Sequence, residues 1–162
     1  FDIVYSNAAI QWMPDHPALL GKLYRMLTPG GVLAVQVPYV GEMPVHLELS
    51  ALENSGKWKP HFDGRVEKHS MHDAPYYYDV LSTLGAQFNI WVTTYIHVME
   101  NHEALVEWYS GSALLPYFKC LDEAQKDAFR QDYLSALRKA YPVQADGKVL
   151  FPFYRIFFTV SK

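Results

Sequence analysis

The sequence predicts an α/β fold, because two short apolar runs flank an amphipathic helix near its start. The runs, Phe1–Tyr5 and Val32–Val37, have the length and character of strands buried on both faces of a parallel sheet. Between them, His16–Leu27 carries leucines at helical spacing, and a Pro-Gly-Gly sequence at 29–31 ends that helix. Strand, helix, tight turn and strand in this order indicate a βαβ unit with a right-handed crossover.

Further along the chain, two long strands enclose a helical segment. The strands are predicted over Gln87–Met99 and Val149–Val160, where side-chain character alternates with a period of two. The intervening residues Asn101–Tyr141 are predicted to be helical, with an interruption at the Ser-Gly-Ser sequence 110–112. Shorter helices are expected over Val45–Asn54 and Ala74–Leu84, and a surface loop that could contain a short helix over Ser55–Asp73.

The composition indicates one globular domain, or one domain with a small appendage. The chain has 162 residues, half of them hydrophobic, so a sizeable core can form and disorder is not expected. Its net charge of -3 and the absence of a basic run argue against nucleic-acid binding. A single cysteine, Cys120, fits a reducing compartment, and no apolar segment is long enough to span a membrane. We therefore expect a cytoplasmic protein without nucleic-acid or membrane partners.

Polar side chains follow both predicted strands of the βαβ unit. Ser6 and Asn7 come directly after the first run. Gln11 and Trp12 follow closely, and Gln36 lies near the end of the second run. The carboxyl edge of an open α/β sheet is where such folds bind ligands, so these residues are candidates for a binding site. The structural alternative is a turn asparagine, a surface glutamine, a core tryptophan and a Gln36 amide bonded to the backbone.

Other candidates lie on the long strands and in the helical segment. His97 is near the end of the first long strand, and Arg155 lies among phenylalanines on one face of the second. A buried guanidinium requires an anion, which could be a substrate carboxylate or an internal Asp or Glu. Trp108 and Tyr117 could line a pocket, or they could be core aromatics at helical spacing. His97 could likewise be a core histidine.

Five residues that could be mistaken for metal ligands lie in the predicted loop. Their spacing is irregular and no second cluster supports them, so no metal is expected. They are His61, Asp63, His69, His72 and Asp73.

The motifs resemble those of a known enzyme family. Residues 7–12 with Pro14-Asp15, the Pro-Gly-Gly turn and the strand 32–36 resemble the fourth-strand to fifth-strand unit of class I S-adenosylmethionine-dependent methyltransferases. The later motifs are similar to those of the trans-aconitate 2-methyltransferase family. These motifs are Tyr77–Leu81, Ile90-Trp91, Thr93–Tyr95 with His97, Glu107-Trp108, Leu114 with Pro116-Tyr117, Tyr141-Pro142 and Phe153–Arg155.

The resemblance implies a Rossmann-like sheet of which this chain supplies strands four to seven, the last one antiparallel. Residues 1–100 would form a partial core, 101–148 a helical substrate cap, and 149–162 the last core strand. No G-x-G-x-x-G pattern occurs, so we expect the C-terminal portion of a methyltransferase without its N-terminal cofactor-binding half. Such a portion is expected to be inactive alone.

The implied activity is methyl transfer from S-adenosylmethionine to a carboxylate of a small polycarboxylic acid such as trans-aconitate. A carboxylate is already ionised at neutral pH, so no general base is required and no catalytic residue is assigned. Ser6 and Asn7 would contact the cofactor. The expected substrate contacts are Asn7, Gln11, Trp12, Gln36, His97, Trp108, Tyr117 and Arg155.

Two alternatives stay open at this point. Leu115 stands where the family has an arginine, which is compatible with a class I methyltransferase that uses a different small-molecule acceptor. The other alternative is a non-catalytic interaction module. In that case the exposed edge of the first strand would pair with a partner or with a second copy of the chain.

Overall fold

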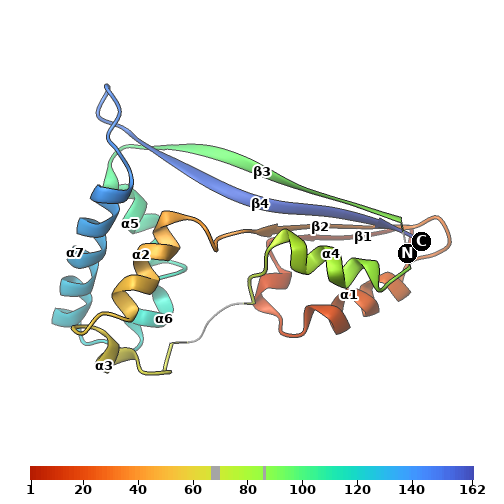
Figure 1. The fold of residues 1–162 in the computed structure, drawn as a ribbon, viewed down its shortest axis with the longest axis horizontal. Coiled ribbons are helices and arrows are strands. Elements are labelled where there is room, and N and C mark those ends of the chain that lie inside the picture. The colour runs from red at the N-terminus through yellow and green to blue at the C-terminus, as the bar shows by residue number, and fades with distance from the viewer. Residues whose placement is uncertain (67–69, 86) are drawn as a thin grey trace. The chain divides into compact units, whose positions relative to one another are not determined.

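The computed structural model describes residues 1–66, 70–85 and 87–162 and contains a four-stranded sheet with helices (Figure 1). The strand order is β1-β2-β4-β3, with β1 parallel and β4 antiparallel to β2. This arrangement confirms the predicted α/β class and the antiparallel last strand. The elements are β1 (Ile3–Asn7), the 3-10 turn η1 (Ile10–Trp12), α1 (His16–Arg25), β2 (Val32–Pro38), α2 (Pro44–Glu53), α3 (Lys59–Phe62), α4 (Ala74–Ser82), β3 (Gln87–Met99), α5 (His102–Ser110), α6 (Leu115–Phe118), α7 (Glu123–Ala140) and β4 (Val149–Ser161).

The chain forms two compact units, each with its own core. Unit 1 comprises Phe1–Gly41, the described residues of His69–Tyr95, and Phe153–Lys162. Unit 2 comprises the described residues of Glu42–Lys68, together with Ile96–Pro152. Strands β3 and β4 each contribute residues to both units. The segment predicted as a substrate cap therefore folds together with residues 42–66, and its role as a cap stays a prediction.

The core of unit 1 lies between the sheet and two helices, α1 and α4, which cover one face of β1 and β2 (Figure 1). Alternate residues of β2 and β4 point into it, as the period of two requires. Asp15 caps α1 by accepting a 3.1 Å hydrogen bond from the Ala18 amide, as its position predicted. The buried cluster consists of Ile10, Leu20, Leu27, Leu33, Val35, Val37, Tyr77, Val80, Leu81, Ile156, Phe158 and Val160.

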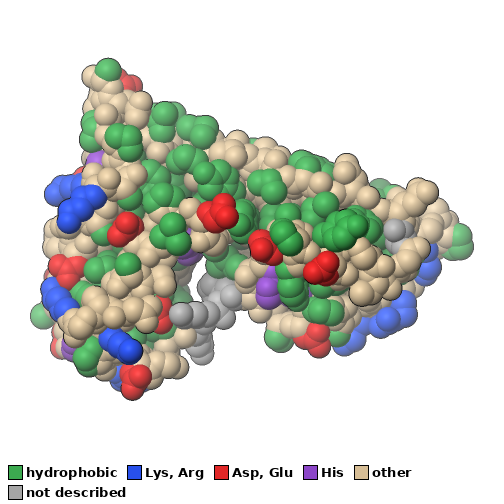
Figure 2. Space-filling view, in the orientation of Figure 1, with side chains coloured by type: hydrophobic (Ala, Val, Ile, Leu, Met, Phe, Trp, Pro, Cys, Tyr) green, Lys and Arg blue, Asp and Glu red, His purple; other side chains and the backbone are tan. Residues whose placement is uncertain are grey.

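Strand β1 differs from its prediction as a strand buried on both faces. It is the outermost strand of the described sheet, and Phe1, Ile3 and Tyr5 are 66%, 69% and 70% exposed. Apolar side chains are also exposed on β3, among them Trp91 and Tyr95. Figure 2 shows such hydrophobic side chains at the surface over β3 and β4. An apolar run indicates a strand, but it does not reveal whether a second layer covers both of its faces.

The Pro-Gly-Gly turn between α1 and β2 requires glycine at position 31 for lack of space. A Cβ atom there would lie 2.8 Å from the Phe1 carbonyl oxygen and 2.9 Å from that of Thr28. The turn is also tied to the end of β4, because the Gly30 amide donates to the Lys162 carbonyl at 2.7 Å. Because hydrogen bonds hold the turn in place, these two carbonyl oxygens cannot easily move away from an added Cβ.

Replacing Gly31 by alanine is expected to lower the free energy of unfolding by about 1–3 kcal/mol, the usual cost of overpacking. The matched control is Gly21→Ala inside α1, where the added Cβ meets only the end of the Arg25 side chain at 3.5 Å. That change should stabilise the helix by about 0.5–1 kcal/mol, because alanine loses less backbone entropy than glycine. Denaturant unfolding followed by circular dichroism measures both, and equal effects would contradict the steric argument.

Unit 2 is built around a cluster of aromatic rings. Phe129 of α7 contacts Trp58, Phe62 and Tyr117, with ring centroids 4.9, 5.2 and 5.7 Å away. Trp58 and Phe62 belong to the segment predicted as a surface loop that could contain a short helix. Helix α3 is such a helix, but both side chains are buried and do not lie at the surface. Periodicity in the sequence did not reveal that this segment packs on α7, because only the two side chains Trp58 and Phe62 make the contact. In the described ranges with gaps at 67–69 and 86, no helix is long and apolar enough to cross a membrane.

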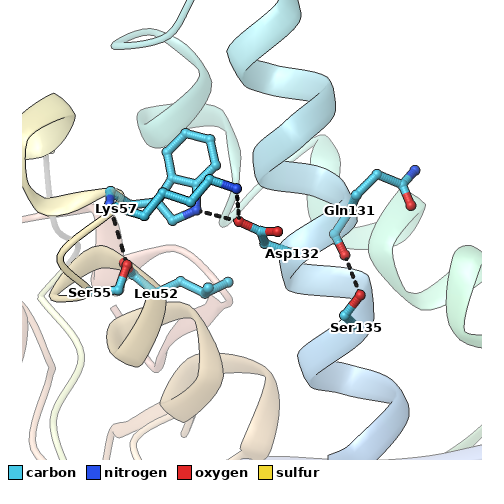
Figure 3. A network of polar contacts seen from close by, with 7 residues as sticks. Leu52, Ser55, Lys57, Gln131, Asp132 and Ser135 are labelled. Carbon is cyan, nitrogen blue, oxygen red and sulfur yellow. Dashed lines mark hydrogen bonds and ion pairs between the residues drawn. The ribbon is translucent and has the colours of Figure 1, made fainter.

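A polar network on α7 holds the same segment in place (Figure 3). One carboxylate oxygen of Asp132 accepts hydrogen bonds from the Lys57 ammonium at 2.6 Å and from the Trp58 indole N–H at 2.7 Å. Burial alone would raise the pKa of Asp132, but these two hydrogen bonds and the Lys57 charge outweigh burial and hold that pKa below its usual value. Asp132 is therefore a stabilising anion in the folded chain.

Asp132→Asn is expected to cost about 0.5–1 kcal/mol at pH 7, because it removes the charge while its side-chain oxygen can still accept from Trp58. The pKa of Asp132 is lower in the folded than in the unfolded chain. The stabilisation is then complete above the unfolded pKa of about 3.9 and is lost as the pH falls through the folded value. Unfolding free energies measured from pH 7 to 3 should converge for the two proteins at the acid end. A difference that stays constant would contradict the role of the charge.

Candidate functional site

Three predicted site residues lie on one face of the sheet, at the carboxyl ends of β1 and β2. Asn7 pairs with Gln36 across the parallel ladder. Gln36 pairs with Phe157 across the antiparallel ladder, and the next same-face position of β4 is Arg155. Directly paired residues share a face, so Asn7, Gln36 and Arg155 form a polar row across three strands. Helices α1 and α4 cover the other face.

Arg155 is half-buried and is oriented by three neighbours. Its Nη1 donates a 2.9 Å hydrogen bond to the side-chain oxygen of Gln36. Its guanidinium carbon lies 5.4 Å from the ring centroid of Tyr95 and 5.0 Å from that of Phe153, within cation–π range. Within the described part of the chain, no carboxylate forms an ion pair with Arg155. The internal Asp or Glu considered from the sequence is thus not found among these residues.

Gln36 is only 3% exposed, and its two ends differ in their partners. The side-chain oxygen accepts from Arg155, whereas the side-chain nitrogen Nε2 is buried and has no hydrogen-bond partner. Its backbone oxygen accepts from the Ala8 amide at 2.9 Å, which fixes the turn after β1 against β2. The alternative that Gln36 only bonds backbone with its side chain does not hold.

Two more buried polar atoms without a partner lie at the end of β1 and in the turn that follows it. Gln11, in η1, is 6% exposed and donates through Nε2 to the Ala8 carbonyl at 2.8 Å, while its Oε1 accepts no hydrogen bond. Ser6 pairs with Val35 and so lies on the opposite face from Asn7, and its hydroxyl is buried without a partner. Trp12 is 59% exposed, which excludes the core role considered for it within unit 1.

His16 supports this turn, a role that its place at the start of α1 did not indicate. The residue is completely buried, and its Nε2 lies 2.9 Å from the Ile10 carbonyl oxygen and 3.1 Å from that of Met13. Carbonyl oxygens only accept, so Nε2 carries the proton, and Nδ1 accepts from the Tyr77 hydroxyl at 3.0 Å. Burial raises the pKa of Tyr77, so this hydroxyl stays a donor. No local pattern indicates this role, because it depends on Tyr77, 61 positions further along the chain.

The remaining predicted substrate contacts lie in unit 2. The His97 ring is edge-on to Trp108 with centroids 4.7 Å apart, and Trp108 is 42% exposed. Tyr117 is buried and donates its hydroxyl to Glu53 at 2.9 Å. Burial and this carboxylate raise the pKa of Tyr117. Leu115, at the first position of α6, is half exposed.

The described histidines of the predicted loop pack against aromatic rings within their own units. His72 stacks on Tyr76 with centroids 3.7 Å apart, and His61 lies beside Trp58. Burial, followed by the proximity of His16, lowers the pKa of His72. His69 lies outside the described residues. Among the described residues, no group of three or more His, Cys, Asp or Glu could hold a metal ion.

The sequence of this chain is similar to those of known methyltransferases. Residues 1–35 match the family model described as a methyltransferase domain. The chain is 40% identical over 163 residues to a trans-aconitate 2-methyltransferase of Rhizobium leguminosarum, with 99% of this chain covered. It is 40% identical over 156 residues to one of Azoarcus sp., with 96% covered. The resemblance to the trans-aconitate 2-methyltransferase family is confirmed.

The match spans nearly all of this chain but only part of its relatives. It covers 63% of the Rhizobium leguminosarum protein and 61% of the Azoarcus protein. Solved structures agree at the level of the fold. A candidate methyltransferase from Bacillus halodurans C-125 has a TM-score of 0.54 at 15% identity, and the YcgJ protein from Bacillus subtilis has 0.54 at 14%. Each alignment covers 100% of this chain and 64% of the other. The chain therefore shares its overall fold with these two structures.

Proposed function

We propose that this chain is part of an S-adenosylmethionine-dependent methyltransferase that esterifies a carboxylate of a small polycarboxylic acid such as trans-aconitate. The observation that supports an acidic substrate is the position of Arg155. It is a half-buried cation at the carboxyl edge of the sheet, and it has no ion-pair partner among the described carboxylates. Identity of 40% to proteins named trans-aconitate 2-methyltransferase supports the reaction.

The turn after β1 fits the amino-acid end of S-adenosylmethionine, which bears both an ammonium and a carboxylate. Gln11 offers a buried acceptor, Oε1, and Ser6 a buried hydroxyl, neither with a partner in the described chain. Asn7 is exposed on the face that carries Gln36 and Arg155. When bound, the cofactor supplies an electrophilic methyl group. We propose Ser6 and Asn7 as its contacts in this chain, with Gln11 and Trp12 next to the reacting groups.

The protein has little acid–base chemistry to perform in this reaction. The carboxylate is ionised at neutral pH, since its reference pKa is about 4, so no side chain has to remove a proton. Positioning of the acid against the methyl donor can supply about 7–11 kcal/mol of the barrier reduction. Arg155 would hold the acid. Gln36, in the same unit, is proposed as a further substrate contact. His97, Trp108 and Tyr117 stay predictions from the sequence.

Methyl-ester formation by the full-length protein tests this proposal. Trans-aconitate is compared with other tricarboxylic, dicarboxylic and monocarboxylic acids at equal concentration, with mass-spectrometric detection of the ester. Turnover of polycarboxylic acids is the expected result. If no acid is turned over, the proposal that a carboxylate accepts the methyl group is contradicted, and a different small-molecule acceptor is favoured. The 162-residue chain is assayed alongside and is expected to be inactive alone.

The exposed strand β1 favours a second candidate function, that of an interaction module. β1 has one neighbour in the described sheet, and its Ile3 and Tyr5 side chains are largely exposed. Such an edge can pair with a second copy of the chain. Light scattering of the 162-residue chain should then show a dimer that Ile3→Lys returns to the monomer. A monomer at every concentration would contradict self-association.

A further inference from the structure

We propose that Gln36 and Arg155 act as one carboxylate clamp, in which Gln36 orients the guanidinium through its side-chain oxygen and offers its side-chain N–H group to the same ligand. The clamp would take a carboxylate of the acid that is not the methyl acceptor. The inference rests on the proposed function and specifies which substrates the site selects.

The orientation of the Gln36 amide follows from its partner. An arginine side chain can only donate, so the Gln36 atom 2.9 Å from Arg155 Nη1 must be the oxygen. The nitrogen therefore lies at the other end of the amide, buried and without a partner. Leaving such a donor unpaired in the folded chain costs stability. An acceptor supplied by a ligand would remove this cost.

The Arg155 guanidinium, like the Gln36 amide, uses only some of its polar groups within the chain. One of its N–H groups donates to Gln36, and others are available to a ligand. Arg155 carries five N–H donors in a fixed planar fork, and a carboxylate can accept two of them in parallel. Tyr95 and Phe153 limit the rotation of this plane by their ring contacts. The Gln36 hydrogen bond fixes the side chain further, so the fork is pre-organised before a ligand binds.

Contrast with a second arginine shows that this arrangement is not general in the chain. Arg138 of α7 forms its ion pair with an internal carboxylate, that of Glu103. Arg155 instead has an amide oxygen and two aromatic rings, none of which neutralises its charge. The positive charge and the free amide donor of Gln36 together suit an anion with two oxygen atoms.

The clamp is suited to an unreactive carboxylate of the substrate. A carboxylate that accepts hydrogen bonds from a guanidinium has its lone pairs engaged, and the positive charge lowers its nucleophilicity. Methyl transfer therefore requires a second carboxylate on the same molecule. The site would select acids with at least two carboxylates, and a monocarboxylic acid would lose the clamp contact.

Gln36→Glu in the full-length protein is the sharpest test. The new carboxylate would keep the contact with Arg155, neutralise its charge and remove the free N–H donor, with little change in side-chain size. We expect KM for trans-aconitate and its Kd by calorimetry to rise about tenfold or more, while a cooperative thermal transition shows that the variant is folded. Arg155→Lys, which keeps the charge and removes the fork, should weaken binding in the same sense. Arg138→Gln is the control, and it should leave both constants unchanged.

The calorimetric titration separates failure of the clamp from failure of the proposed reaction. Weaker binding of the acid in both clamp variants supports the proposal even where no ester forms. An unchanged Kd for the acid in both variants would overturn it. A rise in Kd for S-adenosylmethionine alone would also overturn it, because the clamp would then hold the methionine carboxylate of the cofactor.

Discussion

Replacing Phe129 by alanine is expected to lower the free energy of unfolding by about 3–5 kcal/mol, the usual cost of truncating a fully buried aromatic ring. Phe129 is 0% exposed and contacts the rings of Trp58, Phe62 and Tyr117. Edge-to-face pairs with Trp58 and Phe62 add to the area that is removed from water. The cavity left by alanine would be lined by rings that cannot easily collapse into it.

Denaturant unfolding monitored by tryptophan fluorescence measures this loss, since Trp58 contacts the deleted ring. Phe129→Leu keeps most of the volume and should cost a smaller amount, about 1–1.5 kcal/mol. Leu47→Ala, at a position that is 53% exposed on α2, should have almost no effect. A loss below about 1 kcal/mol for Phe129→Ala would show that the ring cluster is not the core of unit 2.

Local sequence signals account for most of the secondary structure. The strand predicted over Gln87–Met99 is found with those bounds, and α1 begins after the Asp15 cap. Both depend on patterns within a few residues, the alternation of a strand and the cap of a helix. Trp58 and Phe62 were missed because their burial depends on α7, roughly 70 residues further on.

The candidate site shows the same division between local and distant information. Asn7, Gln36 and Arg155 could be selected from the sequence because each is polar within or at the end of an apolar strand. That Gln36 and Arg155 share a hydrogen bond could not, because they are 119 positions apart and meet only through the antiparallel register of β4. His16 and Tyr77 are likewise 61 positions apart. Side-chain pairing of this kind depends on strand order and register, which periodicity does not specify.

Phe158→Ala is expected to lower the free energy of unfolding by about 3–5 kcal/mol, because it opens a cavity in the core of unit 1. Phe158 is 0% exposed, pairs with Val35 across the ladder, and lies 5.2 Å from the Tyr77 ring on α4. It faces the helices, whereas its neighbour Phe157 faces the other side of the sheet. Phe157 is half-buried and stacks on Trp91 at 5.4 Å.

Phe157→Ala is therefore the matched control, one residue away in the same strand and with the same atoms removed. It should cost about 1 kcal/mol, because the lost ring is only half-buried and its site is partly open to water. Unfolding monitored by far-UV circular dichroism compares the two. Equal losses would contradict the expected difference in burial, and a larger loss for Phe157 would mean that β4 presents the opposite face to α1 and α4. Because a one-residue shift in register exchanges the two faces of a strand, such a result would also separate Arg155 from Gln36 and remove the structural basis of the clamp.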